Sequence, residues 1–191
     1  GLAYPADYLT RLREKAGREF YLVVEKILAA DEKLRSDWPV EGTTGYEFGN
    51  QLAQVLANGP GVDAVAEVYD RFLGFKLKYR EVAYRCKKLV METMMASELN
   101  VLGHLLNRIS ESHRWYRDFT LDSLTAAVRE LIACFPVYRT YLDPAKPAEE
   151  DDSRIIHRAL SLVRRRNPAM ERTVLDFLRD VLLPLAENPH P

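Results

Sequence analysis

One short apolar segment constrains the fold of this chain more than any other feature. Residues 20–24 (FYLVV) form a continuous run of aromatic and β-branched side chains, which is typical of a strand buried on both faces in a parallel sheet. The run follows a segment of helical spacing that ends at Gly17, and every later segment has the pattern of a helix or a loop. Because a single strand cannot satisfy its own backbone hydrogen bonds, we expect residues 20–24 either to pair with chain outside this sequence or not to form a strand here. The chain is then expected to be an internal fragment of a larger protein.

The rest of the sequence predicts a bundle of helices. Apolar residues recur at helical spacing in residues 46–57, 62–73, 76–112, 121–135, 149–167 and 169–183. As one helix, residues 76–112 would be about 55 Å long, and a kink is expected near Gly103. We therefore predict a mainly α fold, with one αβ unit in residues 1–36, a helical subdomain in 37–183 and a disordered tail in 184–191.

Charge and composition exclude several classes of partner. The 191 residues include 27 Lys and Arg against 28 Asp and Glu, so the net charge of −1 gives no reason to expect a nucleic-acid or membrane partner. The chain has neither an apolar run long enough to span a membrane nor the pattern of a secretory signal at its start. Cys86 and Cys134 are expected to be small core residues, and with four scattered histidines they form no zinc pattern. We expect a cytoplasmic protein without metal or cofactor.

Glu25 is the first candidate for chemistry, because it directly follows the apolar run. Barrel enzymes place catalytic groups at the carboxyl ends of their parallel strands. Desolvation at such a position would keep a carboxyl protonated and able to act as a general acid. The alternative is an ordinary glutamate at the end of a strand, paired with Lys26 or another neighbour.

The loop over residues 37–46 is a candidate sugar site. Trp38 and Tyr46 offer flat faces for pyranose rings, and Asp37, Thr43 and Thr44 offer hydrogen bonds to hydroxyl groups. The alternative is a capped turn, in which Thr44 is the N-cap of the next helix and Trp38 anchors the loop by packing.

A second aromatic segment follows the helix expected over residues 121–135. Tyr138 and Tyr141 flank Arg139 in the sequence PVYRTY. These side chains could face a ligand or could bury the end of the helix, and the pattern leaves both possibilities open.

Three separated motifs resemble one enzyme family. They are residues 24–28 (VEKIL), 37–47 (DWPVEGTTGYE) and 130–141 (ELIACFPVYRTY), and the opening residues 1–13 (GLAYPADYLTRLR) add to them. Together they resemble maltooligosyltrehalose synthase, or (1→4)-α-D-glucan 1-α-D-glucosylmutase, of the α-amylase clan (glycoside hydrolase family 13). The resemblance extends from residue 1 to about residue 183. Tyr4, Gly49 and residues 58–60 depart from the family pattern.

The resemblance implies a fold and an activity. The family has a (β/α)₈ catalytic barrel with large helical insertions, so residues 1–36 would belong to the barrel and 37–183 to an insertion. The family isomerises the reducing-end α-1,4 bond of a maltooligosaccharide to α,α-1,1 by retaining intramolecular transglucosylation, a step of trehalose biosynthesis. Retention needs two carboxylates, and the motif assigns the acid/base to Glu25. The nucleophile would precede Gly1 and a third acidic residue would follow Pro191, so we expect the isolated fragment to be inactive.

The resemblance also implies the partners of the chain, which are a maltooligosaccharide and the rest of the parent enzyme. The residues expected to bind substrate are Lys26, Asp37, Trp38, Thr43, Thr44, Tyr46, Tyr138, Arg139 and Tyr141. Two alternatives remain. One is a hydrolase of the same clan, and the other is a helical interaction module without chemistry, in which residues 20–24 would pack inside the bundle.

Overall fold

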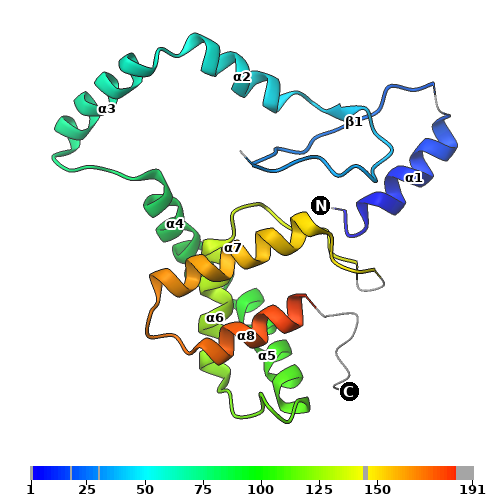
Figure 1. Cartoon of the computed structure of the whole chain (residues 1–191), viewed down its shortest axis with the longest axis vertical. Helices are drawn as coiled ribbons and strands as arrows, with labels where there is room; N and C mark the ends of the chain where they lie inside the picture. The colour runs from blue at the N-terminus through cyan, green and yellow to red at the C-terminus, as the bar shows by residue number, and fades with distance from the viewer. Residues whose placement is uncertain (1, 18, 30, 144–145, 184–191) are drawn as a thin grey trace. The chain divides into compact units, whose positions relative to one another are not determined.

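A computed structural model of the chain describes residues 2–17, 19–29, 31–143 and 146–183. The chain divides into two compact units, unit 1 (Gly1–Lys76) and unit 2 (Leu77–Pro191). The fold is mainly α, as predicted, with two short strands in unit 1 (Figure 1). The division between units falls after Lys76, whereas the predicted division into barrel and insertion falls after residue 36 and stays a prediction.

Unit 1 contains three helices and one pair of strands among its described residues. They are α1 (Pro5–Ala16), β1 (Val23–Val24), β2 (Gly42–Thr43), α2 (Tyr46–Leu56) and α3 (Gly59–Leu73). A proline begins α1, where its missing N–H would have no partner in any case. Gly17 ends α1 with a φ of 90°, a conformation that suits glycine.

The pairing of β1 corrects the prediction of an orphan strand. β1 pairs with β2 in parallel, with Val23 opposite Gly42 and Val24 opposite Thr43. The partner was missed because a Gly-Thr pair has no apolar pattern. The run is also shorter and less buried than expected, since Phe20 and Tyr21 are exposed and precede the strand. These observations contradict the helical module in which residues 20–24 pack inside a bundle.

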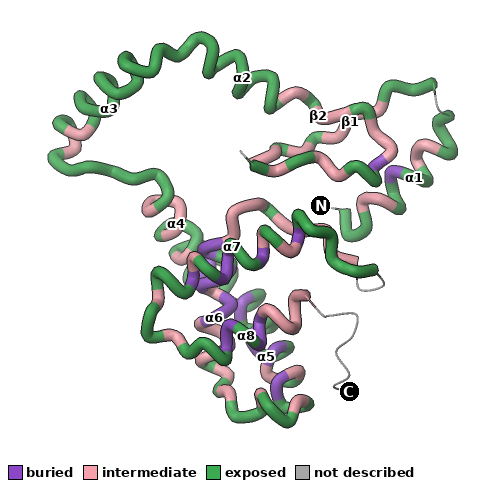
Figure 2. Tube along the Cα trace, viewed as in Figure 1, coloured by how far each residue is buried: buried purple, intermediate pink, exposed green. Residues whose placement is uncertain are grey.

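Unit 2 is a helical bundle with its own core. Its helices are α4 (Tyr79–Thr93), α5 (Ala96–Ser112), α6 (Leu121–Cys134), α7 (Glu150–Arg166) and α8 (Arg172–Leu182). α6 contacts the other four, so it forms the centre of the bundle. The most deeply buried large side chains include Leu124 of α6, Ile156 and Val163 of α7, and Phe177 of α8. Figure 2 shows these buried segments gathered in α6, α7 and α8.

The long helix predicted over residues 76–112 is two helices. The chain leaves the helical path at Met94 and Met95, whose N–H groups both donate to the carbonyl of Val90 at 2.8 and 3.1 Å. Gly103, where the kink was expected, lies inside the continuous helix α5 and packs closely against α6. A Cβ atom at Gly103 would lie 2.3 Å from Oγ1 of Thr125 on α6, so only glycine lets the two helices approach this closely.

Charges at the ends of α7 agree with the helix dipole. Glu150, Asp151 and Asp152 occupy its first turn, and Arg164, Arg165 and Arg166 occupy its last.

The two cysteines have different environments. Cys134 is buried as predicted, whereas Cys86 is exposed on α4, so the core prediction for Cys86 was wrong.

Two expectations concern the ends of the chain and the membrane. The predicted disordered tail, residues 184–191, lies outside the described residues. In the part of the chain that is described, none of the helices has the length and apolar character needed to cross a membrane.

Candidate active site

Glu25 and Tyr46 come together in unit 1, although they are far apart in sequence. Glu25 directly follows β1, and Tyr46 begins α2 directly after the β2 turn. The Tyr46 hydroxyl donates a hydrogen bond to Oε1 of Glu25 at 3.2 Å. The carbonyl of Val24 accepts N–H groups of Thr44 at 3.1 Å and Lys26 at 3.0 Å, which fixes the backbone on both sides of this contact. The sequence pattern gave the two residues as separate candidates, only the resemblance implied one site for both, and the structure brings them within hydrogen-bonding distance.

The carboxyl of Glu25 is exposed. The position of Glu25 after the apolar run predicted desolvation, but the described residues of unit 1 do not bury the side chain. A low-dielectric environment for Glu25 would therefore have to come from groups outside unit 1.

The turn after Glu25 is held by a largely buried ion pair. Lys26 is paired with Glu32, and their side chains are only 11% and 8% exposed. The second carboxylate oxygen of Glu32 accepts the N–H of Ala29 at 3.0 Å. Lys26 thus has a structural role in this turn, and its predicted contact with substrate stays a prediction.

Arg13 and Glu41 hold the segment before β1. Arg13 donates through Nη2 to both carboxylate oxygens of Glu41 at 2.7 Å, and through Nε and Nη2 to the carbonyl of Pro39 at 3.1 and 2.9 Å. Arg13 also bonds the carbonyl of Phe20. Glu41 accepts the N–H of Leu22 at 2.6 Å. The Arg13 hydrogen bond and the Leu22 N–H hold the pKa of Glu41 below its ordinary value.

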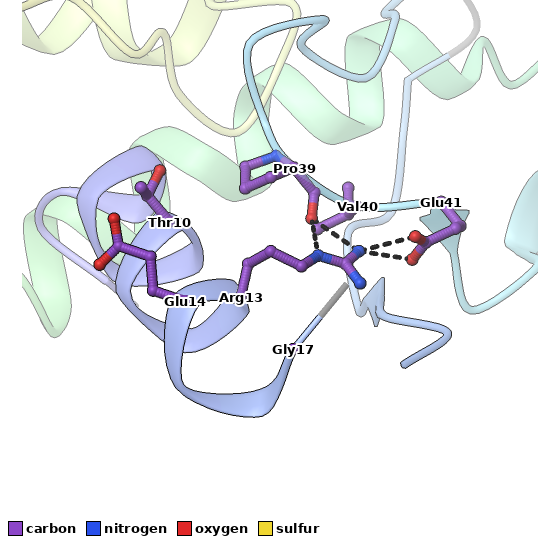
Figure 3. Close-up of a pocket in the computed structure, with 7 residues that line it drawn as sticks. All are labelled: Thr10, Arg13, Glu14, Gly17, Pro39, Val40 and Glu41. Carbon is purple, nitrogen blue, oxygen red and sulfur yellow. Dashed lines mark hydrogen bonds and ion pairs between the residues drawn. The ribbon is translucent and has the colours of Figure 1, made fainter. Parts of the chain in front are cut away.

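An open cavity of about 690 Å³ borders this pair of charges (Figure 3). It is lined by Thr10, Arg13, Glu14, Gly17, Pro39, Val40 and Glu41. The guanidinium group of Arg13 points from α1 across to Pro39 and Glu41, so its donors are directed at the protein's own acceptors.

The other candidate residues of the loop contact residues in or directly beside the loop. Trp38 is buried, which favours the packing anchor over a free sugar platform. Asp37 pairs with Arg35 at 3.0 Å. Thr43 donates to the carboxylate of Glu47, and this hydrogen bond lowers the pKa of Glu47.

The N-cap predicted at Thr44 was wrong. The N-cap of α2 is Gly45, with a φ of 99° and no side-chain cap. Thr44 instead donates its backbone N–H to β1, as described above.

The second aromatic segment belongs to unit 2. The guanidinium of Arg139 lies 4.8 Å from the ring centroid of Tyr141, a cation–π contact. Tyr138 is 82% exposed. The sequence left open whether this segment faces a ligand or buries the end of the helix. The exposed ring of Tyr138 is available to a ligand, whereas Arg139 and Tyr141 are half-buried and stack on each other.

Sequence reasoning missed Arg13 and Glu41. Glu41 lies inside the DWPVEGTTGYE motif and Arg13 inside the opening motif, but neither has a neighbour in sequence that reveals its partner. Their connection depends on the return of the chain from β1 to β2, which the sequence pattern did not show.

Glu130 is a second acidic residue that the structure singles out, on α6 in unit 2. Its carboxylate accepts hydrogen bonds from Lys88 at 2.5 Å, Tyr84 at 2.5 Å and Asn167 at 2.8 Å. Burial works to raise its pKa, but these three donors outweigh burial and hold the pKa below the ordinary value. A buried carboxylate with all its donors inside the protein stabilises the bundle and leaves no oxygen directed at a ligand.

The described residues hold no group of three or more His, Cys, Asp and Glu side chains arranged to bind a metal ion.

The known proteins that the chain resembles are named as trehalose synthases of the maltooligosyl or glycosyl type. No protein-family model matches the chain. A curated maltooligosyl trehalose synthase of Mycobacterium tuberculosis is 46% identical over 61 residues, which is 32% of this chain and 8% of that protein. The chain is also similar in structure to a maltooligosyltrehalose synthase from Arthrobacter ramosus, with 26% identity and a TM-score of 0.74. A glycosyltrehalose synthase gives 29% identity and a TM-score of 0.63.

Both structural matches cover 95% of this chain but only 21% and 22% of the larger proteins. The chain thus spans about a fifth of the length of the solved structures that it matches. The resemblance to a part of maltooligosyltrehalose synthase is confirmed, and so is the mainly α fold class.

Proposed function

We propose that this chain supplies the acid/base carboxylate and a helical part of an enzyme that isomerises the reducing end of a maltooligosaccharide. The reaction converts the terminal α-1,4 bond to α,α-1,1 by retaining intramolecular transglucosylation. One observation supports this most directly: Glu25, the residue assigned by the VEKIL motif, directly follows a strand of a parallel pair and contacts Tyr46 of the second motif.

Glu25 has two roles in this proposal. As the bond from the anomeric carbon to O4 breaks, the protonated carboxyl gives its proton to O4 of the departing glucose, while a nucleophile carboxylate forms an ester with the remaining chain. The released glucose then turns, and its anomeric hydroxyl attacks the same carbon. Glu25 takes the hydroxyl proton as the ester breaks, so the reaction consumes no water and restores both carboxyl groups.

The nucleophile is not assigned to this chain. Retaining catalysis needs two carboxyl groups about 5–5.5 Å apart. Glu25 contributes one, and the resemblance assigns the nucleophile to a position before Gly1. The chain of 191 residues is therefore proposed to be inactive by itself.

We propose that the substrate-binding side chains form two groups. The first surrounds Glu25 and consists of Lys26, Asp37, Trp38, Thr43, Thr44 and Tyr46. The second is Tyr138, Arg139 and Tyr141 in unit 2, whose exposed ring and stacked cation suit contact with sugar faces.

Exclusion of water is the proposed task of the helical part. A glycosyl-enzyme intermediate that meets water is hydrolysed, and a lid over the barrel mouth would prevent this. Arg139→Ala in the longer enzyme is then expected to raise the ratio of hydrolysis to isomerisation. An unchanged ratio together with unchanged isomerisation would contradict the role of the second group.

Free thiols suit the proposed location. Cys86 and Cys134 are both unpaired, which fits a reducing compartment, and we propose that the enzyme is cytoplasmic.

The test of the proposed function uses the longer protein that contains this sequence, with maltopentaose as substrate. We expect loss of reducing ends without release of glucose, and an α,α-1,1 linkage in the product by NMR. Glu25→Gln is expected to lower the rate by about 10²–10⁴-fold. Glu67→Gln, an exposed glutamate of α3, is the matched control and is expected to leave the rate unchanged.

Two results would contradict the proposal. Release of glucose as the main product would favour the hydrolase of the same clan. Full isomerisation by the Glu25→Gln variant would remove Glu25 from the chemistry.

A further inference from the structure

We propose that Arg13 and Glu41 are positioning residues that set the place of Glu25. They do not touch the reacting atoms in this proposal, and they act through the backbone of β1. The inference rests on the proposed function of Glu25, and the experiment below separates the failure of one from the failure of the other.

Glu41 hydrogen-bonds to both backbone groups of Leu22, its N–H and its carbonyl. The Glu41 carboxylate accepts the N–H of Leu22 at 2.6 Å, and the Glu41 N–H donates to the carbonyl of Leu22 at 2.8 Å. The side chain of Glu41 thus extends the ladder between β1 and β2 by one hydrogen bond beyond its backbone pairs. Glu25 lies three residues after Leu22, at the other end of β1.

Arg13 fixes Glu41 in this arrangement. Its guanidinium reaches the carboxylate of Glu41, the carbonyl of Pro39 and the carbonyl of Phe20. One planar group therefore joins α1, the segment before β1 and the segment before β2. The side chain is only 14% exposed, so these charge-assisted hydrogen bonds are partly shielded from water. Lysine could not reproduce them, because an ammonium lacks the flat fork of donors.

On the side of β1 that precedes Val23, the described residues of unit 1 offer few other restraints; the hydrogen bonds of the Val24 carbonyl and the Lys26–Glu32 pair act on the opposite side. Each strand is two residues long, and a strand pair of this size is not stable by itself. The buried apolar side chains described in unit 1 are Leu9 of α1 and Trp38, which is next to Pro39. The polar network of Arg13 and Glu41 is thus a main restraint on the start of the strand that Glu25 directly follows.

The consequence concerns the rate of the chemical step. Displacement of a catalytic group by about 1 Å can lower a rate by about 10²-fold. When Glu41 or Arg13 is changed, Leu22 loses a restraint, and Glu25 will sample positions from which it cannot protonate the glycosidic oxygen. Substrate contacts are made by other residues, so substrate affinity should change little.

The test compares Glu41→Gln and Arg13→Lys with the wild type in the longer protein that contains this sequence. Glutamine keeps the size of Glu41 and removes its charge. We expect kcat per folded molecule to fall about 10- to 100-fold with KM nearly unchanged. The double variant is expected to lose little more than either single variant, because both changes break the same network. Asp151→Asn and Arg154→Lys, which change an exposed ion pair on α7, are the matched controls and are expected to leave kcat unchanged.

The outcomes separate the two proposals. If the wild type forms no α,α-1,1 product, or if Glu25→Gln retains activity, the proposed function fails. If Glu25→Gln is inactive but Glu41→Gln and Arg13→Lys keep the wild-type kcat per folded molecule, the positioning role is overturned. A purely structural role would lower the amount of folded enzyme, measured by circular dichroism, and would leave kcat per folded molecule unchanged.

Discussion

The two units of this chain are stabilised in different ways. Unit 2 buries a continuous set of apolar side chains around α6, including Leu124, Ile156 and Phe177. In the described part of unit 1, the buried apolar side chains are Leu9 and Trp38. α2 and α3 have no buried residue, and their large apolar side chains are exposed, among them Phe48, Leu52, Val55, Leu56, Val65 and Phe72.

The two units therefore depend on different kinds of interaction for their stability. Unit 2 has the packing of an independent helical domain, whereas the candidate site in unit 1 is held by charged hydrogen bonds and a two-residue ladder. Functional segments are often drawn from the less stable part of a protein, since packing alone does not fix them. The comparison makes predictions in which the same substitution has different results in the two units.

The largest expected contrast comes from removing a phenylalanine in each unit. Phe177→Ala removes a ring of α8 that is 1% exposed, and we expect a loss of about 3–5 kcal/mol in the free energy of unfolding. Phe72→Ala on α3 removes a ring that is 84% exposed, and the change should stay within about 0.5 kcal/mol. Urea unfolding followed by circular dichroism measures both. Equal losses would show that α3 is packed in solution.

The sequence predicted the helices better than the strands. Periodicity identified the segments of α2, α3, α6, α7 and α8 because each has an amphipathic pattern that does not depend on the rest of the chain. The break at Met94 and the partner of β1 were missed. An unbroken apolar stripe gives no sign of the break at Met94, and a Gly-Thr pair gives no sign that it is the strand beside β1.

A glycine in each unit gives the next largest contrast. Gly103→Ala would place a Cβ atom against Thr125, and we expect a net loss of about 2 kcal/mol in the free energy of unfolding, although alanine is the better helix former. Gly49→Ala in α2 meets no atom within 4 Å and should stabilise its helix by up to about 1 kcal/mol. Thermal and urea unfolding measure both changes.

A second substitution at the glycine contact provides the control. Thr125→Ala removes the nearest atom, so the double variant should recover part of the loss. Loss of stability in both units would mean that α2 also packs closely against a neighbour.

A tyrosine provides a contrast in pH dependence. The hydroxyl of Tyr116 donates to Asp180 at 2.6 Å, and this bond, together with burial, raises the pKa of Tyr116 to about 12. An unfolded tyrosine titrates near pH 10, so the unfolded chain loses a proton that the folded chain keeps between about pH 10 and 12. The contribution of Tyr116 to the free energy of unfolding is therefore complete below about pH 10 and is lost as the pH rises toward about 12.

Two matched variants test this pH dependence by urea unfolding at neutral pH and at about pH 11. Tyr116→Phe should cost about 1.5 kcal/mol at neutral pH and should weaken the alkaline loss of stability. Tyr21→Phe in unit 1, where the ring is exposed, should change neither the stability at neutral pH nor the alkaline loss of stability. An alkaline loss that persists in full in the Tyr116→Phe protein would contradict the assignment.

The candidate site was predictable in part. The motif and the position after an apolar run singled out Glu25, and the loop motif singled out Tyr46, which the structure brings to Glu25. Burial of Trp38 agrees with the packing anchor, one of the two alternatives that the loop motif left open. The desolvation expected for Glu25 was not found among the described residues, because it depends on which segments fold over the site. Arg13 was missed for the same reason: its acceptors lie in segments that only the folded chain brings together.

The smallest expected contrast concerns the helix N-caps. Thr120 caps α6, since its hydroxyl accepts the N–H of Ser123 at 3.1 Å, and Thr120→Ala should cost about 1 kcal/mol of unfolding free energy. Asn58 occupies the same position at the start of α3 but makes no side-chain cap, so Asn58→Ala should cost only a few tenths of a kcal/mol. Thr120→Ser keeps the accepting oxygen and is the control. A loss of about 1 kcal/mol from Asn58→Ala as well would mean that α3 forms its cap in solution, and the start of α3 would then be as well defined as that of α6.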